Sequence, residues 1–204
     1  MPSKNTVKLF DAPAYYHAYN RGVEKRVIFQ DDDDYAVFMN IMKRYLYPEP
    51  SFDAFGREYE RLDDSLQLVA FCLMPNHFHL LFFQNEPDAM TRFMRKLATT
   101  YSTYFNHKYH REGRLFQGTY KAIQIKDDSY FHHITRYIHL NPKDYLGWKW
   151  SSLSAYLGYR QIGWIHPERL QTMSSDKYLT YLEDYVDYRK SLVEIEDRLA
   201  NGGH

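Results

Sequence analysis

Residues Ala70–Gln84, with the sequence AFCLMPNHFHLLFFQ, carry the clearest structural signal in the chain. An apolar run enters it, the chain turns at Pro75-Asn76, and a second apolar run leaves in the opposite direction. Because side chains alternate between the two faces of a strand, His77 and His79 point the same way. The opposite face of the second run carries only apolar side chains: Phe78, Leu80 and Phe82. The pattern predicts an antiparallel hairpin with one apolar face and one face that carries two imidazoles.

Two imidazoles at alternate positions of one strand can converge on a metal ion, because neutral imidazole is the commonest metal ligand among protein side chains. The same spacing also suits histidines that are satisfied in a core or exposed at a sheet edge. Metal sites usually show a third and a fourth ligand as well. Spacing alone therefore leaves two interpretations of His77 and His79 open, metal ligands or structural residues.

Hydrophobic periodicity and turn residues predict the other elements along the chain. We expect strands over 13–22, 66–74, 78–83 and 120–125, and helices over 35–46, 89–108 and 127–140. The acidic run Asp31–Asp34 before the first helix is explained more simply as capping than as a metal site. The order is β-α-β-β-α-β-α, and its first six elements are those of the ferredoxin-like fold. We therefore predict an α+β protein with an antiparallel sheet and two helices on one face.

The third helix is expected on the other, open face of that sheet. One stripe of this helix carries four residues at helical spacing: Tyr130, Ile134, Tyr137 and Asn141. The apolar strand face that includes Phe78 belongs under the first two helices, so the imidazole face is left for the third. Geometry alone thus predicts that the Tyr137 hydroxyl and the Asn141 amide approach His77 and His79.

Charge is balanced overall but unevenly distributed. The 204 residues include 26 Lys+Arg and 26 Asp+Glu, so the net charge of zero says nothing about partners. Basic residues gather in the middle of the chain, where Glu112 is the only acid among them: Arg92, Arg95, Lys96, Lys108, Arg111, Arg114, Lys121 and Lys126. Such a segment forms either a polyanion-binding face or a solvated helix flank.

The single cysteine, Cys72, lies in an apolar strand and is expected in the core. No disulfide can form within the chain, which is typical of a reducing cytoplasm. The first ten residues lack the apolar segment of a signal peptide, and no stretch reaches transmembrane length. We therefore expect a cytoplasmic protein without a membrane partner.

We expect two parts, a main domain over 1–147 and a mostly helical extension over 148–204. Residues 148–167 mix aromatic residues and glycines without clear periodicity. From 174 to about 199, apolar and tyrosine residues recur at helical spacing. Packing or a dimer contact is the expected role of this helix, and the choice between monomer and homodimer stays open.

Several motifs together resemble the single-tyrosine HUH transposases, the IS200-like group, and within them the REP-associated tyrosine transposases. The matching segments are HAYNRG (17–22), MPNHFHLL (74–81), YFNHKYHREGRLFQG (104–118), RYIHLNP (136–142) and WSSLSAYLG (150–158). Together they cover roughly residues 13–160. One position departs from the pattern, because the family usually carries an arginine where this chain has Thr119.

The resemblance implies cleavage and rejoining of single-stranded or hairpin DNA, at REP-type hairpin sequences, by a bacterial protein that associates with the nucleoid when bound to DNA. In this family pattern His77, His79 and Asn141 hold one divalent metal, Mg or Mn. Tyr137 is the nucleophile and forms a 5′-phosphotyrosine. Elementary chemistry agrees, since only about one tyrosine in a thousand is ionised at pH 7 and a nearby cation or base must activate it.

The residues expected to hold DNA belong to the basic middle and to the NRG turn: Arg21, Arg95, Lys96, Arg114 and Lys121. Two other functions remain open. A ferredoxin-like sheet that bears aromatic residues also suits a hairpin DNA- or RNA-binding module without catalysis. A metal phosphodiesterase that uses water would cut DNA without trapping it on the protein.

Overall fold

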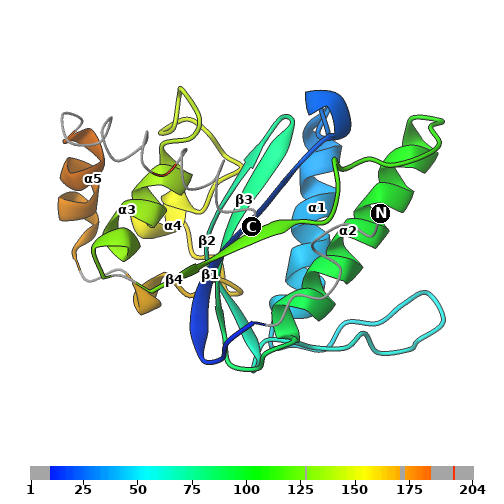
Figure 1. Cartoon of the computed structure of the whole chain (residues 1–204), viewed down its shortest axis with the longest axis horizontal. Coiled ribbons are helices and arrows are strands. Elements are labelled where there is room, and N and C mark those ends of the chain that lie inside the picture. The colour runs from blue at the N-terminus through cyan, green and yellow to red at the C-terminus, as the bar shows by residue number, and fades with distance from the viewer. Residues whose placement is uncertain (1–9, 127, 171–172, 185–194, 196–204) are drawn as a thin grey trace.

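The computed structural model describes residues 10–126, 128–170 and 173–184, together with Ile195. Its centre is a four-stranded antiparallel sheet in the order β2-β3-β1-β4. The strands are β1 (Ala14–Arg21), β2 (Leu66–Met74), β3 (His77–Gln84) and β4 (Lys121–Ile125). Helices α1 (Asp32–Leu46) and α2 (Ala89–Lys108) cover one face, and α3 (Asp128–His139) lies on the other (Figure 1). The predicted ferredoxin-like fold with an additional helix is confirmed.

The element bounds agree closely with the sequence pattern. β3 begins at His77, one residue earlier than predicted, because the turn consists of Pro75 and Asn76 alone. α1 begins at Asp32, and the Asp31 carboxylate accepts a hydrogen bond from the Asp34 amide at 3.0 Å. The capping interpretation of the acidic run is therefore confirmed. The predicted cap at Asp127-Asp128 and the side chain of Tyr130 lie outside what the structure describes.

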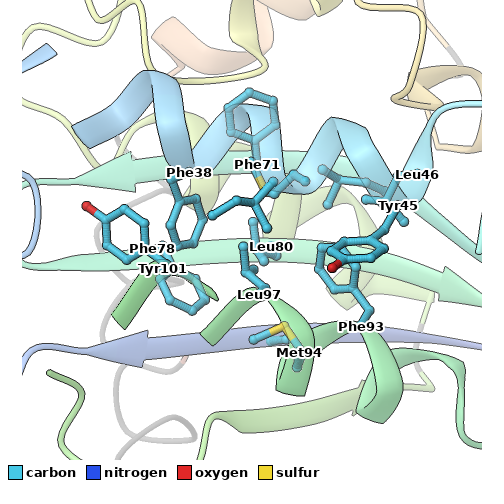
Figure 2. Packing of buried hydrophobic residues seen from close by; sticks show 14 of the residues in the cluster. Phe38, Tyr45, Leu46, Phe71, Phe78, Leu80, Phe93, Met94, Leu97 and Tyr101 are labelled. Atoms are coloured by element: carbon cyan, nitrogen blue, oxygen red, sulfur yellow. The ribbon is translucent and has the colours of Figure 1, made fainter. Parts of the chain in front are cut away.

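The apolar core lies between the sheet and the α1–α2 pair (Figure 2). β3 contributes the side chains predicted for this face, Phe78, Leu80 and Phe82, all of which are buried. α1 contributes Phe38, and α2 contributes a stripe that includes Phe93 and Leu97. Full burial of one such side chain stabilises the fold by roughly 1.5–3 kcal/mol. None of the described helices is both long and apolar enough to span a bilayer.

β2 contains a β-bulge, and this bulge determines which of its side chains pack on each face of the sheet. Its pairing with β3 shifts between Leu68 and Ala70, so Val69 is an extra residue in the strand. A bulge of this kind restarts the alternation of side chains. Leu68 and Phe71 therefore pack under α1 and α2, whereas Ala70 and Cys72 pack on the α3 side. Cys72 is buried in this second core, as predicted.

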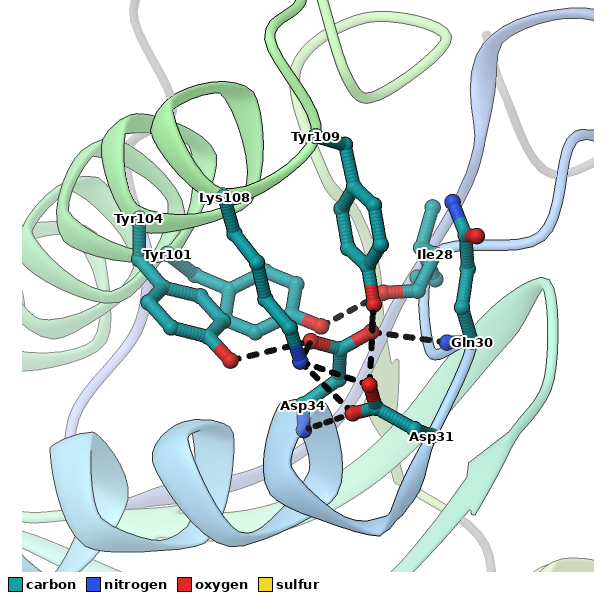
Figure 3. Close-up of polar contacts among 8 residues, drawn as sticks. All are labelled: Ile28, Gln30, Asp31, Asp34, Tyr101, Tyr104, Lys108 and Tyr109. Carbon is teal, nitrogen blue, oxygen red and sulfur yellow. Dashed lines mark hydrogen bonds and ion pairs between the residues drawn. The ribbon is translucent and has the colours of Figure 1, made fainter.

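A buried carboxylate joins the start of α1 to the end of α2 (Figure 3). Asp34 is completely buried and accepts hydrogen bonds from Lys108 at 2.8 Å and from the Tyr109 hydroxyl at 2.8 Å. It also accepts from the Tyr104 hydroxyl at 3.0 Å and from the Gln30 amide at 2.8 Å. Burial of a charge requires such partners. This cluster fixes the point at which the loop from α2 to β4 begins.

The chain after α3 returns along the outer edge of β2. The Leu73 amide donates to the Trp150 carbonyl at 2.9 Å, and the His166 amide donates to the Leu68 carbonyl at 2.8 Å. The later elements are α4 (Leu153–Tyr156), the 3-10 helix η2 (Pro167–Arg169) and α5 (Ser175–Glu183). The single helix predicted from 174 to about 199 is interrupted, because α5 ends at Glu183 and Asp184 is not helical (φ −69°, ψ 77°). The rest of that prediction, apart from Ile195, falls outside the described residues.

Candidate active site

The imidazole face of β3 meets the end of α3. The His77 Nε2 atom lies 3.2 Å from the Oδ1 atom of Asn141, which comes shortly after the last residue of α3. The Tyr137 ring packs edge-on against the His79 ring, with 5.2 Å between their centroids. The structure therefore brings together the four residues that the sequence selected as nucleophile and metal ligands. It establishes their placement, and the chemical roles remain predictions.

Apolar contacts hold α3 in this position. Ile134 and Ile138 are fully buried in the second core, which also contains Leu81 of β3. His139, fully buried, lies 2.6 Å from the Tyr178 hydroxyl and 2.7 Å from the Ser152 hydroxyl through its two ring nitrogens. These contacts link α3 to α5 and to the segment on the β2 edge. The position of Tyr137 is thus set by packing on three sides.

The site keeps its imidazoles neutral. Burial, with a smaller contribution from the positive charge of Arg21, lowers the pKa of His77 to about 4, and the contact with the Asn141 amide opposes this shift. Burial also holds the pKa of His79 well below its usual value, with smaller contributions from His17, His77 and Arg21. Since neutral imidazole is the form that ligates metals, both rings are in the ligating state at pH 7.

The Nδ1 atoms of both rings are engaged by neighbouring side chains. His77 Nδ1 lies 2.6 Å from Asn76 Oδ1, and His79 Nδ1 lies 2.9 Å from Nε2 of His17, a fully buried residue of β1. The Nε2 atom of His79 is buried and has no hydrogen-bond partner among the described residues. The two Nε2 atoms therefore remain available on the side of the site where Asn141 and Tyr137 lie.

A cavity of about 480 Å³ opens beside these groups. Its lining residues come from β1, β3, α3 and the loop before β4: Tyr19, Asn20, Arg21, His77, His79, Tyr137, Gln117, Gly118, Thr119 and Lys121. Arg21 lies directly opposite His77 in the β1–β3 pairing, and Lys121 lies opposite Tyr19 in the β1–β4 pairing. Two cations thus face a space bordered by the imidazoles and the phenol, which suits a phosphate group.

The structure separates the five cations predicted to hold DNA. Arg21 and Lys121 line the cavity, and Arg114 is exposed in the loop before β4. Arg95 and Lys96 lie on α2, which packs on the opposite face of the sheet. Lys96 is paired with Glu60 at 3.0 Å there. The basic middle of the chain is therefore divided between two faces of the sheet.

Sequence reasoning missed His17 and Asn76. His17 stands in the predicted first strand, and a prediction that β1 lies beside β3 would have placed it near His79, since the register sets Tyr19 opposite His79. Asn76 was assigned to the turn alone, although an amide next to a candidate ligand is a recognisable outer-shell partner. The loop residues 117–119 also line the cavity, and among them is Thr119, the position that departs from the family pattern.

Known proteins share both the sequence pattern and the fold of this chain. Residues 57–141 match the family model described as Transposase IS200 like. A solved structure of a REP-associated tyrosine transposase bound to a REP hairpin superposes with a TM-score of 0.52 at 16% identity, covering 80% of this chain and 92% of the other. At this identity the likeness shows the fold.

A putative transposase from Deinococcus radiodurans R1 superposes with a TM-score of 0.40 at 16% identity, over 68% of this chain and 95% of that one. No curated protein sequence matches the chain. The family match spans both strands of the central hairpin, α2, β4 and α3, and ends at Asn141. Residues 57–141, which include both imidazoles of β3, the phenol of α3 and the amide just after it, belong to the IS200-like transposase family.

Proposed function

We propose that this protein cleaves and rejoins single-stranded DNA at hairpin sequences, with Tyr137 as nucleophile and a divalent metal, Mg or Mn, held by His77, His79 and Asn141. The observation that carries the proposal is the meeting of a ring nitrogen of His77 and the amide oxygen of Asn141 at 3.2 Å, with the Tyr137 ring packed against His79. The family of residues 57–141 supports DNA processing.

The donor set fits a divalent metal. Two neighbouring ligands of octahedral Mg²⁺ lie about 3 Å apart, given bonds of about 2.1 Å, and His77 Nε2 and Asn141 Oδ1 are 3.2 Å apart. The buried Nε2 of His79 has no partner among the described residues, and it would supply a further lone pair with the ring proton on Nδ1, donated to His17 Nε2. The described residues contain no group of three or more His, Cys, Asp or Glu side chains arranged to hold a metal. In the proposed site the amide oxygen of Asn141 is the third protein ligand, and substrate phosphate completes the set.

The bound metal would polarise the scissile phosphate and neutralise charge that develops on it. Tyr137 attacks that phosphorus with its phenol oxygen and gives up its proton. An O–P bond to tyrosine forms, the bond from phosphorus to the 3′ oxygen breaks, and this oxygen takes up a proton as the 3′-hydroxyl. Rejoining reverses these steps with the 3′-hydroxyl of another strand. The phosphotyrosine conserves the energy of the phosphodiester, so no ATP is required.

DNA is held beside the nucleophile by the cations of the cavity. Arg21 and Lys121 both line it, and neither forms an ion pair with a described acidic residue that would compete with phosphate, in contrast to Lys96 and Lys108 on α2. A hairpin as substrate is supported by the likeness in fold to the transposase that was solved on a REP hairpin. Tyr19, a half-buried aromatic residue at the cavity, offers a surface for base stacking.

The proposal is tested by denaturing electrophoresis of the protein incubated with labelled hairpin single strands and Mg²⁺ or Mn²⁺. Wild type should form a covalent protein–DNA adduct that a chelator prevents. Tyr137→Phe should abolish the adduct and leave DNA binding within about threefold, because only the hydroxyl is lost. Tyr159→Phe, at a residue that is 75% exposed, is the matched control and should behave as wild type.

Other outcomes separate the alternative functions. An adduct that persists in Tyr137→Phe would show that another residue is the nucleophile. Cleavage without any adduct would indicate a phosphodiesterase that uses water. Binding that ignores chelators, with no product under any metal, would indicate a nucleic-acid-binding module without catalysis.

A further inference from the structure

Asn76 lies between the backbone of one loop and the side chain of a candidate metal ligand. Its Nδ2 atom donates to the Lys25 carbonyl at 3.1 Å, and its Oδ1 atom lies 2.6 Å from His77 Nδ1. Asn76 is one of the two residues of the turn between β2 and β3, and His77 is the first residue of β3. The two contacts use opposite ends of one amide, so the partner of Nδ2 determines which atom faces His77.

The Lys25 carbonyl determines which way the amide points. A carbonyl oxygen only accepts hydrogen bonds, so the group that faces it must be the NH₂ of Asn76. The amide oxygen then faces His77, and this oxygen also only accepts. His77 Nδ1 must therefore carry the proton and donate to Asn76 Oδ1. A neutral imidazole has a single N–H, which leaves His77 Nε2 as a bare lone pair.

This tautomer changes the meaning of the contact on the opposite side of the ring. His77 Nε2 faces Asn141 Oδ1 at 3.2 Å, and with the proton on Nδ1 both of these atoms are acceptors. Two acceptors that face each other at this distance do not form a hydrogen bond, but both can ligate one cation. With His77 Nδ1 protonated by its contact with Asn76, His77 Nε2 and Asn141 Oδ1 are therefore a pair of candidate metal ligands and not a hydrogen-bonded pair.

The loop that presents the Lys25 carbonyl is itself closely fixed to the turn. The Gly22 amide donates to the Asn76 carbonyl at 2.9 Å, and a side chain at Gly22 would collide with the Arg26 carbonyl. Lys25 has a φ of 59°, in the left-handed region that non-glycine residues rarely occupy. Backbone of this kind is usually retained where the surroundings require it. Here it aims a carbonyl at the Asn76 amide.

We propose that Asn76 is a positioning residue that holds His77 in the Nδ1–H tautomer and so keeps His77 Nε2 unprotonated and aimed at Asn141. The inference deepens the proposed function, on which its catalytic meaning rests, but the tautomer itself is a property of the metal-free protein. Loss of an outer-shell partner of this type lowers metal affinity or activity about 10- to 100-fold in other proteins.

The first test is nitrogen NMR of metal-free protein labelled at histidine, which shows which ring nitrogen carries the proton. In wild type His77 should be protonated at Nδ1. Asn76→Ala should transfer a measurable share of the proton to Nε2, where it is free to donate to Asn141. Asn76→Asp should restore the Nδ1–H tautomer in part, because a carboxylate oxygen can accept from Nδ1 but cannot donate to the Lys25 carbonyl.

The second readout is the affinity for Mn²⁺ alone, measured by titration of the free ion's electron paramagnetic resonance signal. Asn76→Ala should weaken binding about 10- to 100-fold, and Asn76→Asp, which keeps the acceptor but loses the donor, should recover part of it. Asn85→Ala is the matched control, because Asn85 comes directly after the other end of β3 and its Nδ2 also donates to a backbone carbonyl, that of Asp64, at 2.9 Å. It should bind Mn²⁺ as wild type does.

These outcomes separate the inference from the proposed function. A wild-type His77 protonated at Nε2 would overturn the inference without any variant, and so would an Asn76→Ala protein with unchanged tautomer and Mn²⁺ affinity. A wild type that shows the predicted tautomer and binds Mn²⁺ but forms no DNA adduct would contradict the proposed function and leave the positioning role of Asn76 supported.

Discussion

The two faces of β3 have the same backbone and opposite surroundings. Phe78, Leu80 and Phe82 are buried in the apolar core under α1 and α2. His77 and His79, displaced from them by one residue, point towards α3, a cavity and two cations. Because alternation separates the faces, the strand can be rigidly packed on one side and polar on the other. Substitutions at adjacent positions should therefore produce different kinds of defect.

The largest effect is expected on the imidazole face. His77→Ala removes a candidate metal ligand, so adduct formation with hairpin DNA should fall by more than the roughly 100-fold that loss of an outer-shell partner can cost. The free energy of unfolding should change by less than about 1 kcal/mol, since His77 is only half-buried. Adduct assays and urea denaturation measure the two quantities. A variant that unfolds but retains adduct formation would reverse the assignment of the two faces.

The apolar face should show the opposite result. Phe82 is fully buried, and Phe82→Ala should lower the free energy of unfolding by about 3–5 kcal/mol through lost burial and the cavity left behind. Adduct formation per folded molecule should stay near the wild-type value when it is measured well below the melting temperature. Phe55→Ala, at a side chain that is 83% exposed, is the control and should leave stability unchanged.

The polar cluster around Asp34, which lies on the same side of the sheet as the apolar core, should contribute less to the free energy of unfolding than Phe82 does. Asp34→Asn keeps the shape but loses the charge that accepts from Lys108 and two tyrosines. We expect a loss of about 2 kcal/mol, within the range for hydrogen bonds to charged groups, because Lys108 is partly exposed and its attraction is screened. Asp33→Asn, in the same helical turn but exposed, should be neutral. Equal effects of the two substitutions in denaturation would show that the buried cluster adds nothing.

The smallest effect concerns which cations contact DNA. Lys121→Ala should reduce the slope of log affinity against log salt concentration by about 0.7, the value of one phosphate contact on single strands. Arg95→Ala should leave the slope unchanged, because Arg95 lies on α2, beyond the apolar face. Fluorescence anisotropy with a labelled hairpin at several salt concentrations measures both. A changed slope for Arg95→Ala would place DNA on both faces of the sheet.

The elements and their buried faces could be predicted from the sequence, because apolar residues recur with the period of the helix or strand wherever one face is buried. The alternation in β3 and the stripe on α3 were enough to bring Tyr137 and Asn141 to the imidazole face. Charge has no such period. A lysine on α2, such as Lys96, has the same local sequence signal whether it faces DNA or a glutamate, so only the structure could separate it from Lys121.

Contacts between segments that are distant in the sequence were also out of reach. His17 meets His79 through a pairing register that neither strand specifies alone. The partner of Asn76 is a backbone carbonyl, which every residue possesses and no residue type reveals. The segment at 148–167 pairs with β2 through irregular backbone hydrogen bonds, which leave no periodic pattern of side chains.

The segment that pairs with the outer edge of β2 is made much later than β2 itself, and this delay affects the chain during synthesis. Trp150, whose carbonyl pairs with the Leu73 amide, comes 77 residues after Leu73. At about 5–20 residues per second the ribosome needs roughly 4–15 s to make that length. During this interval β2 has an unpaired edge in an apolar hairpin, the condition under which nascent chains join one another. The order of the segments along the chain thus leaves the outer edge of the central hairpin open to pairing with other strands until Trp150 has been made.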